Sequence, residues 1–155
     1  MGPQVITLDT SGLLALANRR DPDHERSKAA LMHDRGPYLV PAGILGEVAY
    51  MLEQRLGLRI LDLFLSDLLS GAYTLDCGAD DFGRIRQLVQ EYADLPLGFA
   101  DAAVVACAER SGGRVLTLDL RDFGVVARAG SIMILPGQRE SRSSRAPQSS
   151  PDSGS

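Results

Sequence analysis

The first apolar run of the chain, residues 5–8 (VITL), shows no alternation of apolar and polar positions. A run of this kind is typical of a strand whose two faces are both buried. Further short strands are predicted over residues 38–40, 72–75, 115–118 and 131–135. Each of these runs is bounded by glycine, proline or a charged residue, which marks the points where the strands end.

Between these strands, apolar residues recur at helical spacing. Helices are predicted from Leu13 to about residue 20, from Asp21-Pro22 toward Gly36, over residues 41–56, 58–69 and 79–92, and from Gly98 to the turn at Gly112. Only a short turn, residues 120–123, is predicted before the final strand. Strands that alternate with helices predict an α/β fold with a parallel or mostly parallel sheet flanked by helices.

The composition changes after this alternating region. Residues 137–155 contain seven serines and no large apolar residue, so they cannot bury a core and are predicted to be a disordered Ser/Arg/Pro-rich tail. The whole chain has 155 residues, 45% of them hydrophobic, which suits one domain with one core. We therefore predict a single domain over residues 1–136.

Charge and cysteine content narrow the class of protein. The formal net charge is −4, and Lys28 is the only lysine beside many arginines. This bias permits a nucleic-acid partner, but an arginine-rich genome is the better explanation for it. The two cysteines, Cys77 and Cys107, form no CxxC pair, which argues against a zinc site and a disulfide framework and favours a reducing compartment. No signal peptide and no membrane-length apolar run are recognised, so we expect a cytoplasmic protein with no membrane partner.

Four acidic residues occupy positions where chemistry is expected in such a sheet. Asp9 and Asp119 directly follow predicted strands, and Asp101 lies in the first turn of a predicted helix. Glu47 lies at the edge of an apolar helix stripe, where a lone charge is costly. Each has an ordinary explanation taken singly: a turn acid, a helix-dipole partner, a cap, or half of an ion pair.

Together the four acids indicate a metal site. Parallel strands bring their carboxyl ends to one edge, and carboxylates crowded there repel one another unless a cation neutralises them. Mg²⁺ or Mn²⁺ suits oxygen ligands, and such an ion can activate water for phosphodiester hydrolysis without a nucleophilic side chain. This agrees with a chain whose two histidines, His24 and His33, we expect at the surface. Asp76 and Asp122 occupy similar positions and compete for membership of the site.

Several phrases resemble a known family. LDTSGLLAL (8–16), GEVAYML (46–52), FADAAVVACAERSG (99–112) and VLTLDLRDF (115–123) are similar, in this order, to PIN-domain ribonucleases, specifically the VapC-type toxins of type II toxin-antitoxin systems. The resemblance covers residues 5–136. It implies a PIN-like three-layer α/β/α sandwich with a central, mostly parallel sheet of four to five strands.

The resemblance also assigns roles to residues. Four acids match the family's metal centre: Asp9, Glu47, Asp101 and Asp119. Asp9 and Asp101 are expected to be direct metal ligands, and Glu47 and Asp119 to hold water or a second ion. Ser11 and Thr117 match the family's supporting Ser/Thr positions. Asp76 has no counterpart, and Asp122 is expected only to support the turn.

The function implied is Mg²⁺-dependent (or Mn²⁺-dependent) hydrolysis of RNA phosphodiesters, which leaves a 5′-phosphate. The resemblance further implies a structured RNA substrate such as transfer RNA or a ribosomal RNA loop, a homodimer, and a cognate VapB-type antitoxin that covers the acidic groove. Arg19, Arg20 and Arg121 lie near predicted strand ends, where they could hold RNA.

Three alternatives stay open at this point. A receiver-type signalling domain also gathers acids around Mg²⁺, but it resembles a pattern with paired acids after the first strand and a lysine after the last. Here Thr10 follows Asp9, and Lys28 lies in the second predicted helix. The other two alternatives are a PIN nuclease of RNA processing that is not a toxin, and a PIN-like module that binds RNA or protein without cleaving.

Overall fold

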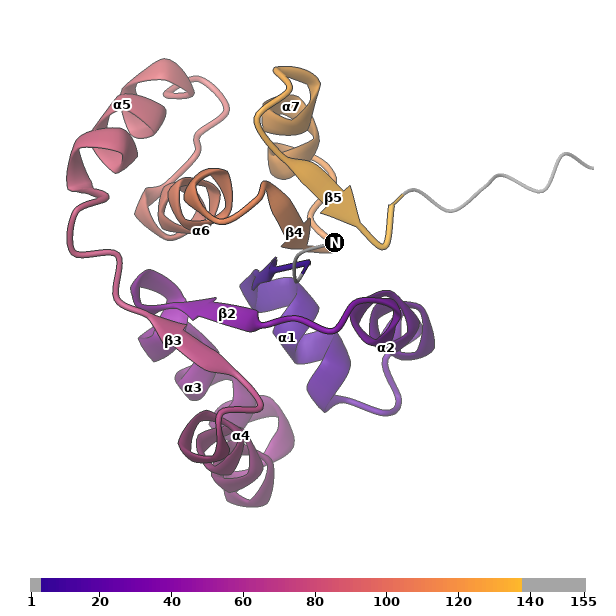
Figure 1. Cartoon of the computed structure of the whole chain (residues 1–155). Helices are drawn as coiled ribbons and strands as arrows, with labels where there is room; N and C mark the ends of the chain where they lie inside the picture. The colour runs from indigo at the N-terminus through magenta and orange to yellow at the C-terminus, as the bar shows by residue number, and fades with distance from the viewer. Residues whose placement is uncertain (1–3, 138–155) are drawn as a thin grey trace, which may run out of the picture.

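The computed structural model describes residues 4–137, and these form a parallel sheet surrounded by helices (Figure 1). The elements follow in the order β1 (Ile6–Leu8), α1 (Thr10–Ala17), α2 (His24–His33), β2 (Tyr38–Pro41), α3 (Ala42–Leu56), α4 (Leu58–Ser70), β3 (Thr74–Asp76), α5 (Phe82–Glu91), α6 (Phe99–Arg110), β4 (Arg114–Leu116), α7 (Asp122–Arg128) and β5 (Met133–Leu135). All paired strands run parallel, in the order β3-β2-β1-β4-β5. The predicted α/β architecture is confirmed.

The direction of winding changes at the carboxyl end of β1, and the edge of the sheet outside the ends of β1 and β4 is called the crevice below. The chain moves from β1 to β2 on one side and later returns to β4 on the other side, so the direction of winding reverses between β1 and β4. Ligands of open parallel sheets bind at such a reversal, outside the carboxyl ends of the strands. Leu8 and Leu116 are paired in register there. The residues that follow them, from Asp9 and from Thr117 onward, therefore enter the crevice from both sides.

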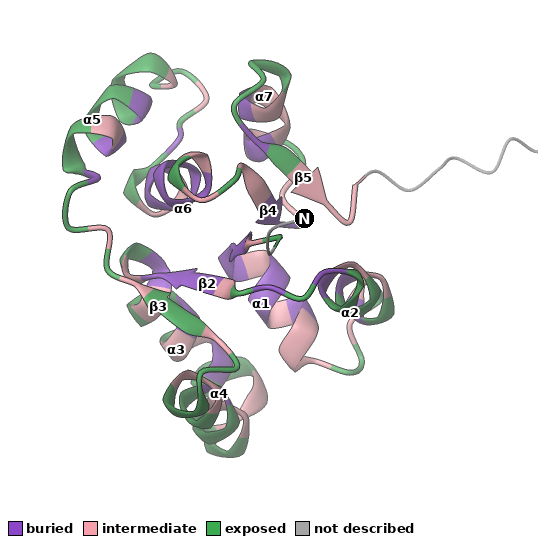
Figure 2. Ribbon diagram, viewed as in Figure 1, coloured by how far each residue is buried: buried purple, intermediate pink, exposed green. Residues whose placement is uncertain are grey.

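Helix α6 is the most deeply buried helix of the described chain, and it is purple along most of its length in Figure 2. All seven residues from Ala102 to Ala108 are buried. Its small side chains allow α6 to pack closely against the strands β1, β2 and β4 and against the helices α3 and α5. Its first turn, with Asp101, is thereby held at the edge of the sheet where the crevice lies.

Glycine permits two close approaches beside the crevice. A Cβ atom on Gly12 of α1 would lie 2.5 Å from the backbone oxygen of Leu116. A Cβ atom on Gly43 of α3 would lie 2.7 Å from the Cβ of Ala103 on α6. Since real Cβ atoms do not approach so closely, these glycines set how near α1 lies to β4 and how near α3 lies to α6.

Some local predictions were wrong. β4 ends at Leu116 rather than at residue 118, because its neighbour β1 ends at Leu8 and offers no further ladder. Asp119 therefore follows the strand by three residues rather than directly. Helix α2 begins at His24 rather than at Asp21-Pro22, since the Asp21 carboxylate accepts the backbone N–H of Asp23 and closes a turn there.

Helix α7 was not predicted at all. Its sequence, DFGVVAR, combines a glycine with β-branched valines and has low helix propensity. It forms because Phe123 and Val126 are buried in the core, at 0% and 1% exposure. Tertiary packing here outweighs local preference.

His24 also differs from expectation. It was predicted at the surface, yet only 9% of it is exposed. Its Nδ1 atom lies 2.8 Å from the backbone oxygen of Ala15, so the ring is held between α2 and α1.

No helix within residues 4–137 is long and apolar enough to cross a membrane. The predicted disordered tail lies, apart from Gly137, outside the described residues. The domain boundary at residue 136 stays a prediction.

Candidate metal centre

Asp9 is the deepest acid of the crevice. It follows β1 and precedes the first residue of α1, and only 5% of it is exposed. Its Oδ2 atom accepts hydrogen bonds of 2.9 Å from the hydroxyls of Ser11 and Thr117. Burial raises the pKa of Asp9, and the hydrogen bonds from Thr117 and Ser11 oppose that increase. Both predicted Ser/Thr residues thus act on one carboxylate oxygen.

The two hydroxyls also organise the loop that follows β4. Ser11 Oγ accepts the backbone N–H of Leu118 at 2.9 Å, and Thr117 Oγ1 accepts that of Asp119 at 3.0 Å. A hydroxyl has one proton, so when each donates to an ionised Asp9 it can only accept from the loop. The network therefore couples the carboxylate of Asp9 to the path of the chain toward Asp119.

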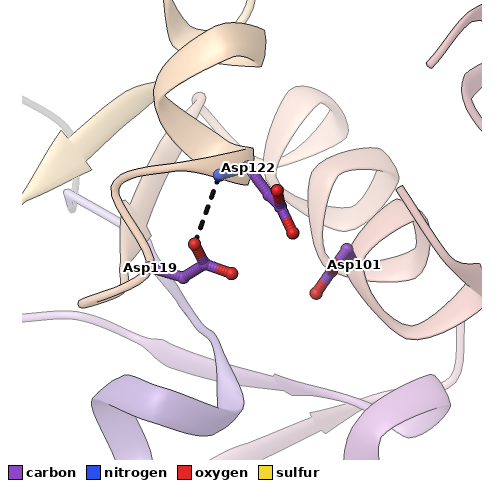
Figure 3. Close-up of side chains that lie close together, drawn as sticks. All are labelled: Asp101, Asp119 and Asp122. Carbon is purple, nitrogen blue, oxygen red and sulfur yellow. Dashed lines mark hydrogen bonds between the residues drawn. The ribbon is translucent and has the colours of Figure 1, made fainter. Parts of the chain in front are cut away.

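Three further acids meet across the crevice (Figure 3). One carboxylate oxygen each from Asp101, Asp119 and Asp122 lies within 4.8 Å of the other two. Figure 3 shows Asp101 on α6 facing the pair Asp119 and Asp122 at the start of α7. The backbone N–H of Asp122 also donates to Asp119 Oδ1 at 3.2 Å, which fixes the orientation of that carboxylate.

Asp101 experiences the charge of all the other acids. Burial, followed by the negative charges of Asp9, Asp119, Asp122 and Glu47, raises the pKa of Asp101 to about 6. A carboxyl with such a pKa is mostly ionised at neutral pH, where its charge adds to the repulsion among the acids and favours a bound cation. Asp101 is therefore the electrostatic centre of the cluster.

Glu47 lies at the rim. It is exposed on α3, and its Oε2 atom accepts a 3.0 Å hydrogen bond from the hydroxyl of Thr10. The sequence placed Glu47 at the edge of an apolar stripe, and the fold turns that edge toward Asp101, since α3 and α6 are packed together.

The donor set fits a hard divalent cation. Within residues 4–137, none of the five acids of the crevice forms an ion pair with lysine, arginine or histidine. These acids are Asp9, Glu47, Asp101, Asp119 and Asp122. Carboxylate oxygens without basic partners are the ligands that Mg²⁺ and Mn²⁺ prefer. A bound cation would relieve the repulsion that raises the pKa of Asp101.

Comparison with known proteins gives the family. The family model of the PIN domain matches residues 6–129. The chain belongs to the PIN-domain family. It is also 33% identical over 127 residues to ribonuclease VapC26 of Mycobacterium tuberculosis (strain ATCC 25618 / H37Rv), a match that covers 81% of this chain and 94% of VapC26. The resemblance to VapC-type proteins found in the sequence is therefore confirmed.

A solved structure gives the same result for the fold. The crystal structure of VapC20 from Mycobacterium tuberculosis, a toxin that cleaves the sarcin-ricin loop, superimposes with a TM-score of 0.66 at 25% sequence identity. The match covers 81% of this chain and 95% of VapC20. The predicted PIN-like sandwich is thus the observed fold, with a sheet of five strands.

Two residues of this PIN domain were undervalued from sequence. Asp122 was expected only to support a turn, yet its carboxylate joins the cluster with Asp101 and Asp119. Its position three residues after Asp119 had made it a competitor for the site in the sequence, before the family resemblance reduced it to a supporting role. Thr10 was noted only as a departure from a receiver pattern, and its contact with Glu47 has no sequence signal because 37 positions separate them.

Asp76 lies outside the metal centre. Although it follows a Thr-Leu pair just as Asp9 does, Arg110 donates to its carboxylate at 2.7 and 3.3 Å. The same guanidinium also binds Asp81 at 2.8 and 2.9 Å, and these bonds raise the pKa of Arg110. Asp76 is therefore neutralised by the protein itself and has no need of a metal.

The predicted RNA-binding arginines are separated from the acids. Arg19 and Arg20 follow the carboxyl end of α1, whereas Asp9 lies at its beginning. They line a different groove, formed by residues of α1 to α4. Arg121 alone lies beside the cluster, exposed and adjacent to Asp122.

Proposed function

We propose that this PIN-domain protein is a divalent-metal-dependent endoribonuclease that acts as the toxin of a toxin-antitoxin pair. One observation carries the proposal: carboxylates from separate elements converge at the β1/β4 crevice with no basic partner among the described residues. The names of the relatives, ribonuclease VapC26 and the toxin VapC20, support the choice of RNA as substrate.

Asp9 and Asp101 are our first choices as metal ligands. Glu47 and Asp119 are proposed to hold water or a second ion. Asp122 is a further candidate ligand because its carboxylate joins those of Asp101 and Asp119. Ser11 and Thr117 hold Asp9 in place. Bound Mg²⁺, or Mn²⁺, would supply a Lewis acid that lowers the pKa of a water molecule and offsets charge on the phosphoryl group.

The proposed reaction is hydrolysis of one RNA phosphodiester. Water adds to phosphorus, the bond from phosphorus to the 3′ oxygen breaks, and the products carry a 5′-phosphate and a 3′-hydroxyl. Among the described residues, no cysteine or histidine lies with the acids: His24 faces Ala15 and Cys107 contacts Thr7, while His33 ends α2 and Cys77 follows β3. The acids therefore act by holding and orienting rather than by covalent attack.

The substrate is proposed to be a structured RNA, a transfer RNA or a ribosomal RNA loop. VapC20 cleaves the sarcin-ricin loop, and this activity of a structural relative supports the second of these substrates. A chain with net charge −4 needs the metal and local arginines to hold a polyanion, and exposed Arg121 is the arginine nearest to the acids in sequence.

The antitoxin partner is proposed to bind a groove on the helices α1 to α4. This groove has a volume of about 920 Å³ and includes Leu13, which lies one turn after Asp9. Its floor is apolar, with Leu16, Leu52, Ile60 and Phe64, and its rim carries Arg19, Arg20, Lys28, Arg55 and Arg59 against the single acid Asp67. An amphipathic segment with acidic residues suits such a surface, so one segment of a VapB-type antitoxin is proposed to dock here, beside the crevice that holds the acids.

A homodimer in the cytoplasm completes the proposal. Large apolar side chains remain exposed around the sheet edge formed by β3, namely Tyr50, Leu75, Phe82 and Phe99. Two of them, Phe82 and Phe99, line a pocket of about 340 Å³ whose other lining side chains are mostly apolar or small. A second copy of the chain would cover this surface, as expected for contiguous apolar patches.

Cleavage assays test the enzyme directly. The purified protein should cut RNA in Mg²⁺ or Mn²⁺, stop in excess chelator, and resume when metal is restored. Sequencing of the 5′-phosphate ends that accumulate after induction would locate the bond. Cleavage that persists without metal would reject the mechanism.

A growth assay distinguishes the toxin from the alternatives. Expression should arrest growth, and co-expression of the neighbouring gene product should relieve the arrest. An RNA-processing nuclease would cleave RNA without arrest and relief, and a binding module would not cleave at all.

A further inference from the structure

Glu47 is unusual among the acids of the crevice because it is exposed on the rim. A glutamate side chain has three rotatable bonds, so an exposed one samples many rotamers. Its negative charge and that of Asp101 also repel each other. Something must hold Glu47 toward the crevice if it is to contribute there.

Thr10 makes that contact. Its hydroxyl donates to Glu47 Oε2 at 3.0 Å, and within residues 4–137 this is the only hydrogen bond or ion pair of the Glu47 side chain. Thr10 itself is only 9% exposed, as the first residue of α1 directly after Asp9. A fixed donor therefore meets a flexible acceptor.

The packing of the helices makes the contact possible. Helix α3 contacts α1 on one side and α6 on the other. Gly43, one turn before Glu47, allows the close approach to Ala103 of α6. The position of α3 thus brings Glu47 within reach of Thr10 and of the charge of Asp101.

We propose that Thr10 is a positioning residue whose hydroxyl holds Glu47 at the metal centre. The bond engages Oε2 and leaves Oε1 without a hydrogen bond from the described chain, free to accept from a metal-bound ligand. Thr10 does not touch substrate or metal; it acts through Glu47. This inference rests on the proposed metal-dependent function.

A purely structural role for Thr10 makes different predictions. Thr10 could matter only because it begins α1, in which case its loss would lower stability but would not depend on Glu47. The two roles are separated by a double-mutant cycle between Thr10 and Glu47.

The experiment measures binding of Mn²⁺ alone to the purified full chain by electron paramagnetic resonance. Four variants are compared with the wild type: Thr10→Val, Thr10→Ser, Glu47→Gln and the double variant Thr10→Val/Glu47→Gln. Thr10→Val replaces the hydroxyl by a methyl group of similar size. Thr74→Val, on the exposed part of β3, is the matched control.

Loss of a residue that orients a metal ligand typically weakens metal binding about 10-fold or more. We therefore expect Thr10→Val to weaken Mn²⁺ binding by about this factor. Thr10→Ser, which keeps the hydroxyl, and Thr74→Val should bind as the wild type does. The double variant should bind no more weakly than Glu47→Gln. If Thr10→Val does not fold, as judged by thermal unfolding, Thr10→Ala takes its place in the same cycle.

The outcomes are distinct. Unchanged binding in Thr10→Val, or effects of Thr10→Val and Glu47→Gln that add in full, would overturn the role of Thr10 and leave the metal-dependent function standing. A wild type that binds no Mn²⁺ would instead overturn the proposed function, and the role of Thr10 with it.

Discussion

The hydroxyl of Thr117 donates a 2.9 Å hydrogen bond to the carboxylate of Asp9, a residue 108 positions earlier in the chain. This bond joins the two strands that flank the crevice, because Asp9 follows β1 and Thr117 follows β4. Ser11 donates to the same oxygen. The deepest acid of the site is thus held by hydroxyls on both sides.

Thr117→Val should lower the free energy of unfolding by about 1–3 kcal/mol, because Asp9 Oδ2 and the N–H of Asp119 each lose a partner in the interior. Denaturant titration measures this loss. Ser11→Ala removes a second hydrogen bond from the same Asp9 oxygen. The loss of unfolding free energy in the double variant should therefore differ from the sum of the losses in the two single variants. Strict additivity would show that the two hydroxyls act independently.

Asp101→Asn should reduce RNA cleavage by at least about 100-fold, because it removes a charged ligand from the centre of the acid cluster. The fold should survive, since the change relieves like-charge repulsion at nearly constant volume. Cleavage assays and thermal unfolding measure the two effects. Asp9→Asn should behave in the same way for cleavage, and undiminished activity in either variant would contradict the site assignment.

The stability of the metal-free protein should fall as the pH rises. The pKa of Asp101 is raised from 3.8 to about 6 in the folded protein, so ionisation is harder in the folded than in the unfolded chain. The contribution of Asp101 to stability is therefore complete below pH 3.8 and is lost as the pH passes through 6. Urea titrations across this range measure it.

Two comparisons test whether the raised pKa of Asp101 causes this decline in stability. Asp101→Asn should show a smaller decline, although some should remain because the pKa of Asp9 is raised as well. Added Mg²⁺ should reverse the decline, since it favours the ionised carboxylates. An equal decline in Asp101→Asn and wild type would place the effect elsewhere.

Gly12→Ala should destabilise the protein by about 1–3 kcal/mol through overpacking, because the new Cβ would meet the backbone oxygen of Leu116 at 2.5 Å. Denaturant titration again measures the change. Gly46→Ala in α3 is the matched control, since nothing lies within 4 Å of its Cβ position. In Gly46→Ala the better helix propensity of alanine should raise the free energy of unfolding by at most about 1 kcal/mol.

Asp76→Asn should leave RNA cleavage nearly intact. Its carboxylate is bound by Arg110, which retains Asp81 after the change. The stability loss should be about 0–1 kcal/mol, because Arg110 is 44% exposed and such ion pairs contribute little. A strong loss of cleavage would assign Asp76 a role in the metal centre.

Local sequence patterns were sufficient for the architecture and for most of the acids. Apolar runs separated by helical segments predicted the parallel sheet because the periodicity of side chains follows directly from backbone geometry. Asp9 and Asp119 could be named as candidates because parallel strands bring their carboxyl ends to one edge, and Asp101 because it lies in the first turn of a helix. Helix α7 could not be predicted, because its sequence has low helix propensity and the helix depends on the burial of Phe123 and Val126 in the core.

Only the tertiary structure decided which acids belong together. Asp76 and Asp9 share the same local sequence, Thr-Leu-Asp, yet Arg110 binds one and the hydroxyls of Ser11 and Thr117 bind the other. Asp122 joins the cluster, and Thr10 reaches Glu47, through contacts that depend on how α1, α3, α6 and α7 pack. The sequence by itself determined the fold class and the chemistry that the acids can perform, because both depend on local pattern and residue type. Packing decided the membership of the site, because distances between residues far apart in the chain exist only once the core has formed.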